Sequence, residues 1–257
     1  MHRERQITCD YGTEYAARRW GAAVELADRQ HGVVSLAQLV ALGIDNSTAR
    51  RWVAIGRLQR LHRAVFAVGH RALRREGHWT AAVLACGRDA ALSHRPAGAL
   101  QDLCSPPNGR IDVTVPGRIG RSRRGVRVHS GDRLPPDEVT VVDGVPCTNL
   151  PRTILDLASV LEGRALEGIC ERAARLQVFD AFELGALLAR HRGRRGVGRL
   201  RAVLAAWDSD LATRIASSKP GSFGWSSMRA SSGRSSTAWS RRGSGNSRST
   251  SIGPLTE

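Results

Sequence analysis

The sequence predicts an α+β fold on three observations. Residues 32–69 contain two short helical patterns with capping residues, followed by an alternating apolar run. Residues 90–148 contain several short alternating segments bounded by turn formers. From Pro151 to Trp207, apolar residues recur at helical spacing. We therefore expect an N-terminal helical part with a β-ribbon, a small mixed α/β domain and then a helical segment.

The N-terminal pattern predicts a winged helix–turn–helix. Ser35 can cap a first helix that ends at Gly43, and a second helix ends at Gly56. The second helix is expected to begin near three residues that all cap well: Asp45, Asn46 and Ser47. Beyond it, residues 58–68 alternate as a two-stranded ribbon that turns near His62 and Arg63, where a wing belongs. The alternative is a generic three-helix fragment with a solvated basic face.

The side of the second helix opposite its apolar residues favours a nucleic-acid partner. Amide, hydroxyl and guanidinium donors there suit base edges and phosphates, and they come from Asn46, Ser47, Arg50, Arg51 and Arg57. Further arginines, Arg60 and Arg63, follow in the ribbon. A helix followed by a wing fits the grooves of double-stranded DNA.

Composition agrees with that partner. The net charge is +16, from 39 Lys+Arg against 23 Asp+Glu. Almost every basic residue is arginine, with Lys219 as the exception. Because lysine codons are AT-rich, part of this bias follows from a GC-rich genome, so the position of the arginines carries the information. A basic chain of this kind binds phosphate with a strong salt dependence.

The sequence has no features typical of a membrane protein, a secreted protein or a known enzyme class. No run of about 18 apolar residues predicts a membrane span, and Met1 to Tyr15 lack the apolar stretch of a signal peptide. The five cysteines are odd in number and widely spread, as expected of free thiols in a reducing cytoplasm. We find no phosphate loop, nucleophile elbow or zinc-protease motif. We therefore expect a cytoplasmic protein without catalytic residues, metal ligands, cofactor or membrane partner.

The expected domains follow from these patterns. They are a flexible N-terminus (1–17), the winged helix–turn–helix (18–70), a mixed α/β domain (71–150), a helical segment packed on it (151–208) and a disordered tail (209–257). In the α/β domain, Ser93 is expected to cap a helix and Asp143-Gly144 to turn a hairpin. The arginine-rich loop at 117–125 is expected to contact DNA or to be a solvated hairpin tip. The acids of the helical segment have the spacing of helix-surface charge: Asp156, Glu162, Glu167 and Glu171.

The order of short motifs resembles the AbiEi-type antitoxin family of type IV toxin–antitoxin systems. The motifs include Ala49-Arg-Arg-x-Val, Leu61-His-Arg-x-Val-Phe-Ala-Val-Gly69 and Arg152-Thr-Ile-Leu-Asp-Leu-Ala158, and the resemblance covers about residues 22–206. It implies a winged helix that binds operator repeats and represses its own operon, and a following domain that counteracts a nucleotidyltransferase-like toxin. The matching positions give DNA-contact candidates at Asn46, Ser47, Arg50, Arg51, Arg57 and His62, beside Arg60 and Arg63. Ala64 departs from the glycine that is frequent at the wing turn, and Phe66 from a frequent tyrosine.

The tail differs in composition from the rest of the chain. From Leu211 it has many serines, seven basic residues and one acid, Glu257. High-GC relatives usually continue into a PD-(D/E)XK nuclease-like domain, similar to very-short-patch-repair endonucleases. A shifted reading frame of the tail gives an apolar pattern resembling the start of such a domain. We therefore expect a frame break, no cleavage activity and, as an alternative function, an inactive truncated remnant of a nuclease fusion. A third interpretation is a protein-interaction scaffold with a solvated basic face.

Overall fold

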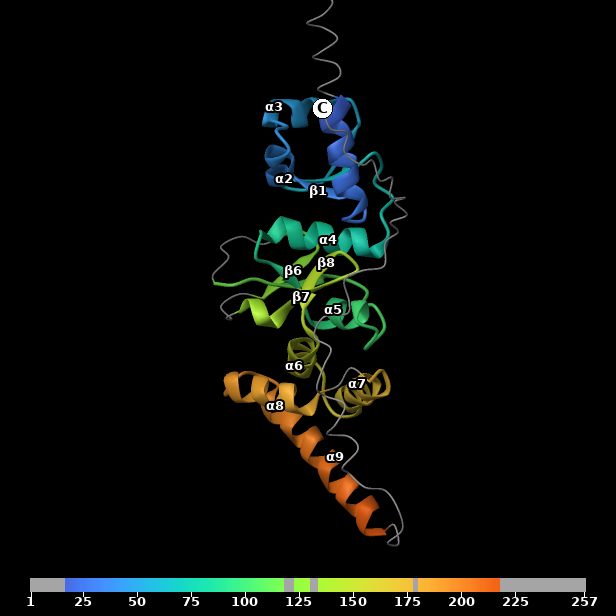
Figure 1. Cartoon of the computed structure of the whole chain (residues 1–257), viewed down its shortest axis with the longest axis vertical. Helices are drawn as coiled ribbons and strands as arrows, with labels where there is room; N and C mark the ends of the chain where they lie inside the picture. The colour runs from blue at the N-terminus through green and yellow to red at the C-terminus, as the bar shows by residue number, and fades with distance from the viewer. Residues whose placement is uncertain (1–16, 118–122, 130–133, 178–179, 218–257) are drawn as a thin grey trace, which may run out of the picture. The chain divides into compact units, whose positions relative to one another are not determined.

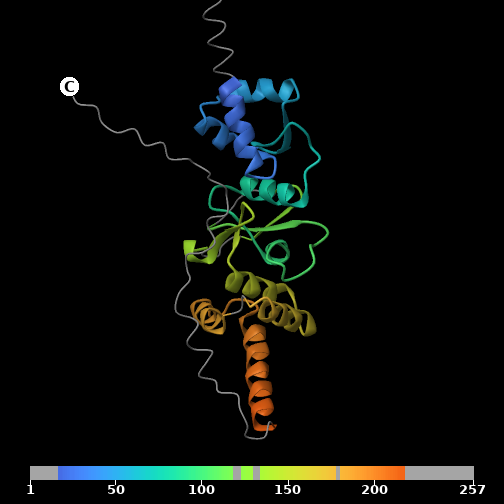
Figure 2. The same cartoon turned by 45° about the vertical axis from the view of Figure 1, so that its right-hand side comes forward.

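The computed structural model describes residues 17–117, 123–129, 134–177 and 180–217, and the side chains of these residues apart from Ala181 and residues 208–217. It has the mixed α+β architecture that the sequence predicts (Figures 1 and 2). The chain divides into two compact units at Ser209. The elements below belong to the first unit, apart from the end of helix α9. The predicted N-terminal flexible segment and residues 218–257 of the predicted tail lie outside the described residues.

The N-terminal part has the predicted arrangement of two helices and a wing. After a helix over residues 17–28 come β1 (Val33–Ser35), α2 (Leu36–Ala41), α3 (Asn46–Ala54), β2 (Leu58–His62) and β3 (Val65–Val68). The three strands form an antiparallel sheet in the order β1-β3-β2. Strand β1 is an addition to the predicted ribbon, because three residues are too short for an alternation to be recognised.

Helix α4 (Arg75–Cys86) packs against both sheets of the molecule. Ala81 and Ala85 join a core cluster with Val33 and Val65 of the N-terminal sheet. The other side of the helix, which includes Trp79, packs on a five-stranded sheet. In Figure 1 the helix lies between the two sheets. Because α4 is covered on both sides, it contributes apolar residues to the cores of both the winged domain and the middle domain.

The middle sheet has the strand order β6-β5-β4-β8-β7. Its elements are β4 (Ala91–Leu92), α5 (His94–Leu100), β5 (Ile111–Thr114), β6 (Val126–His129), the 3-10 turn η1 (Pro136–Glu138), β7 (Val139–Val142) and β8 (Val145–Thr148). Asp143 and Gly144 both have positive φ, 47° and 73°, at the predicted hairpin turn. Ser93 is the N-cap residue of α5, as predicted, but its hydroxyl makes no cap hydrogen bond and lies 3.0 Å from His94 Nδ1 instead.

The helical segment follows as α6 (Leu150–Val160), α7 (Arg164–Arg175), α8 (Ala181–Arg190) and α9 (Val197–Ser217). Their apolar faces form one core cluster around Ile154, Leu166 and Leu184. Helix α9 continues to Ser217, so it includes residues 209–217 of the predicted tail. Leucine and alanine, good helix formers, still occur at Leu211, Ala212 and Ala216, before the Ser/Gly-rich text begins.

Candidate nucleic-acid interface

Two N-terminal caps fix the helix–turn–helix. Ser35 and Gln38 form a capping box at the start of α2, in which the Gln38 backbone N–H donates to Ser35 Oγ at 3.2 Å. At the start of α3, Asp45 Oδ1 accepts the Thr48 backbone N–H at 2.7 Å. Hydrogen bonds from Thr48 and Ser47 lower the pKa of Asp45, which keeps the cap ionised at neutral pH. Helix α3 therefore begins at Asn46 with its first turn held in place.

One side of α3 is buried and the other is open to solvent. Ala49 and Trp52 belong to the N-terminal core, and the Trp20 ring meets Trp52 edge-on with centroids 4.9 Å apart. Four of the predicted contact residues lie on the exposed side: Asn46, Ser47, Arg50 and Arg51. The helix thus presents its polar donors outward, as the sequence predicts.

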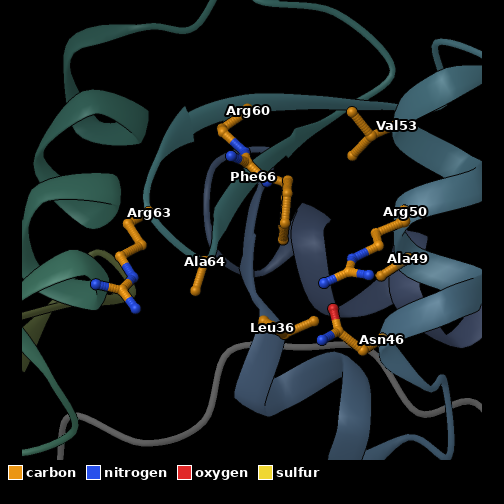
Figure 3. A pocket seen from close by; sticks show the side chains of 9 residues that line it. All are labelled: Leu36, Asn46, Ala49, Arg50, Val53, Arg60, Arg63, Ala64 and Phe66. Carbon is orange, nitrogen blue, oxygen red and sulfur yellow. The ribbon is translucent and has the colours of Figure 1, made fainter.

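A hollow of about 340 Å³ lies between α3 and the wing. Asn46 and Arg50 of α3, Arg60 of β2 and Arg63 of the turn line it. The remaining lining is apolar, from Leu36, Ala49, Val53, Ala64 and Phe66. Figure 3 shows the amide of Asn46 and the guanidinium of Arg50 directed into this space, and Arg63 beside Ala64 at its far side. Four of the eight predicted residues therefore gather around one hollow.

The other four predicted residues lie elsewhere. Ser47 donates its hydroxyl hydrogen to Asp45 Oδ1 at 3.0 Å, so it supports the cap. Arg51 is exposed on α3 outside the hollow. The guanidinium of Arg57 stacks on the Trp20 ring, 5.2 Å from the centroid. His62 is half-buried, and burial together with the positive charges of Arg123 and His78 lowers its pKa, which favours the neutral ring.

The arginines around the hollow have no acidic partner among the residues that the structure describes. Within the described part of the chain, no side-chain hydrogen bond or ion pair occupies Arg50, Arg51, Arg60 or Arg63, and no acidic residue lines the hollow. Guanidinium groups that are exposed and unpaired attract phosphate. The electrostatic character of this surface is therefore that of an anion-binding face.

Sequence reasoning missed a buried charge cluster among η1, α6 and the segment before α9. Asp156, which was expected on a helix surface, is fully buried. Its Oδ1 accepts from Arg152 Nε at 3.0 Å and from Arg194 Nη2 at 2.8 Å, and Arg152 also pairs with the buried Glu138. An acid and an arginine four residues apart, inside an apolar helix pattern, were the available signal. The expectation is confirmed for Glu167 and Glu171, which are exposed on α7, whereas Glu162 is exposed in the connection between α6 and α7.

Metal sites, membrane-spanning helices and reactive thiols were also sought among the described residues. They contain no gathering of three histidine, cysteine or acidic side chains suited to a metal ion. No helix among them is both long and apolar enough to cross a membrane. The four described cysteines are unpaired, and burial raises the pKa of the Cys147 and Cys170 thiols to about 11, so both are protonated at neutral pH.

The helices, the wing and the basic hollow define a winged helix–turn–helix domain. Residues 22–69 match the family described as "Transcriptional regulator, AbiEi antitoxin". This segment is therefore of the AbiEi type, and the resemblance noted in the sequence is confirmed for it. A search of curated proteins finds no significant match to the chain. The family match supports a DNA-binding, antitoxin-like role.

Proposed function

We propose that this chain is a transcriptional regulator that binds operator repeats in its own promoter and represses a toxin–antitoxin operon. The observation that carries the proposal is the set of unpaired arginines around the hollow between α3 and the wing. An α-helix fits the major groove of B-DNA, and a wing beside it can reach the backbone or the adjacent groove. Arginines free of protein partners would supply the phosphate attraction.

The predicted residues are proposed to have different roles in DNA binding. Asn46, Arg50, Arg60 and Arg63 surround the hollow and form the central set. Arg51, exposed on the same helix, is proposed as a phosphate contact. Ser47, Arg57 and His62 are engaged or half-buried within the protein, so we assign them to the support of α3 and the wing.

The proposed partners extend beyond DNA. On the analogy of AbiEi antitoxins, the domain after residue 70 would neutralise a nucleotidyltransferase-like toxin in the cytoplasm. The role would be regulatory, without a reaction catalysed by this chain. The middle sheet and the helices α6 to α9 offer the surface for such a partner, since the helix–turn–helix face would be occupied by DNA.

A mobility shift on the gene's own promoter tests the proposal. The Arg50→Ala/Arg51→Ala double variant should bind about tenfold or more weakly, because losing the base contact of Arg50 costs about 1–3 kcal/mol and losing the phosphate contact of Arg51 adds to it. Arg175→Ala on α7, an exposed arginine outside this surface, is the matched control and should bind as the unmodified protein does. Equal affinity for promoter and scrambled duplex at every salt concentration would refute operator recognition.

A further inference from the structure

Two neighbouring arginines of α3 have different surroundings. Arg50 and Arg51 are both exposed, and neither has a side-chain partner among the described residues. Arg50 lines the hollow beside Asn46, whereas Arg51 lies about 100° further around the helix and outside the hollow. The same residue type thus occurs twice, once facing the hollow and once facing open solvent.

Asn46 and Arg50 form a pair on one side of the helix. They are four residues apart, and Figure 3 shows the amide and the guanidinium directed into the same space. Between them, Ala49 is 2% exposed and presents only a methyl group. Around them the lining is apolar or arginine. A base edge that entered here would therefore meet no competing acidic acceptor.

The chemistry of the two side chains selects purines. A guanidinium fork donates to O6 and N7 of guanine, and an asparagine amide donates to N7 of adenine while accepting from its N6 amino group. Four residues of helix advance about 6 Å along the axis, at 1.5 Å each. Stacked bases are about 3.4 Å apart along one strand. The spacing of the pair therefore corresponds to roughly two base steps.

We infer that Asn46 and Arg50 read an adenine and a guanine about two base steps apart in the major groove, whereas Arg51 contacts phosphate without reading sequence. The inference rests on the proposed function and adds the sequence class of the DNA. It makes Asn46 and Arg50 the specificity-determining residues of α3. The Asp45 cap holds the first turn of the helix, so the amide of Asn46 is presented from an ordered position.

The test uses purine analogues in the gene's own promoter. A footprint of the unmodified protein first locates the bound segment, and 7-deazaguanine or 7-deazaadenine then replaces each purine within it, one at a time. Each analogue removes only the N7 acceptor. We expect one guanine and one adenine, about two steps apart, at which the analogue weakens binding about tenfold or more.

Single variants assign the two positions. Arg50→Ala should bind the natural duplex about tenfold or more weakly, and should no longer respond to 7-deazaguanine at the sensitive position. Asn46→Ala should lose only the response to 7-deazaadenine. Arg51→Ala, the matched control, should keep both responses, weaken all duplexes alike and lower the slope of log affinity against log salt by about one.

The outcomes separate the two proposals. If Arg50→Ala weakens promoter and scrambled duplexes equally and keeps its response to the analogue, the assignment of base reading is wrong while DNA binding stands. The same holds if no purine of the footprint responds in the unmodified protein. If the unmodified protein has no preference for its promoter, the proposed function itself fails. Circular dichroism of each variant verifies that α3 remains folded.

Discussion

Ala64 holds the turn of the wing in a left-handed conformation. Its φ is 60°, and its carbonyl accepts the Leu36 backbone N–H at 2.8 Å, which ties the turn to the start of α2. An L-residue with a Cβ pays a steric cost in this region, and glycine does not. The turn therefore forms with Ala64 in place of the glycine that is frequent there, and the strain is confined to this residue.

We expect Ala64→Gly to stabilise the protein by about 0.5–1 kcal/mol, because it removes that strain. Thermal and urea unfolding measure the change. Ala37→Gly is the control: Ala37 is exposed in α2, where glycine should destabilise by about 1 kcal/mol. A fall in stability for Ala64→Gly would contradict the assignment of strain to this turn.

His94 is a second residue with positive φ, 52°, and its ring is buried. It stacks on His129 with centroids 3.8 Å apart, and His129 Nε2 lies 2.8 Å from Asp112 Oδ1. Burial, and secondarily the charge of His129, lowers the pKa of His94 to about 3. Arg152 and Arg194 act in the same direction, and Asp112 opposes them. The folded protein therefore keeps this ring neutral.

The depressed pKa makes stability depend on pH. Below pH 6.5 the unfolded chain takes up a proton at this histidine and the folded chain does not, so stability falls as the pH falls from about 6.5 towards 3. The loss is about 1.4 kcal/mol per pH unit. His94→Asn tolerates positive φ and removes the titration. Between pH 6.5 and 5, its unfolding free energy should fall by about 2 kcal/mol less than that of the unmodified protein. The same dependence of unfolding free energy on pH in both proteins would contradict the lowered pKa of His94.

At the scale of elements, Arg152 joins three parts of the chain. From α6 it pairs with Glu138 of η1 and Asp156 of its own helix, and Asp156 also binds Arg194 before α9. His191 Nε2 lies 2.7 Å from the other oxygen of Glu138. All three central groups are at most 1% exposed. Removing Arg152 would leave Asp156 with Arg194 and Glu138 with Arg190 and His191, so each buried carboxylate would lose part of its counter-charge.

We expect Arg152→Leu to cost about 3–5 kcal/mol in chemical denaturation, because Glu138 and Asp156 each lose their buried arginine partner. Arg175→Leu is the matched control. Arg175 pairs with Glu171 at 3.6 Å on the surface of α7, with both side chains more than half exposed, and its loss should cost less than about 0.5 kcal/mol. Similar costs for the two variants would show that the buried network contributes little.

Elements were predictable where the signal was local. The caps at Ser35 and Asp45, the α3 pattern and the Asp143-Gly144 turn depend on neighbouring residues, and the structure has each of them. The burial of Asp156 was not predictable, because its partner Arg194 is distant in the sequence, as is Glu138, which pairs with the neighbouring Arg152. An acid on a helix is usually solvated, so the local pattern favoured the wrong environment.

At the scale of the whole molecule, α4 decides how the winged domain is supported. It contacts all three strands of the N-terminal sheet and the middle sheet through opposite sides (Figure 2). The segment before β1 also approaches the β7–β8 turn, since His31 Nε2 lies 2.6 Å from the Asp143 carbonyl oxygen. A Cβ on Gly144 would come within 2.7 Å of the Arg29 carbonyl oxygen. The segment before β1 therefore packs directly against the β7–β8 turn of the middle domain.

The sequence alone predicts the elements of the winged domain, its basic outer face and the resemblance of residues 22–69 to AbiEi antitoxins, because caps, helical periodicity and motif order are local properties. Only the tertiary structure separated Asn46, Arg50, Arg60 and Arg63, which surround the hollow, from Arg57 and His62, which turn towards the protein. Whether a side chain can reach DNA depends on residues that folding brings close from distant positions. Trp20 does so for Arg57, and Arg123 for His62.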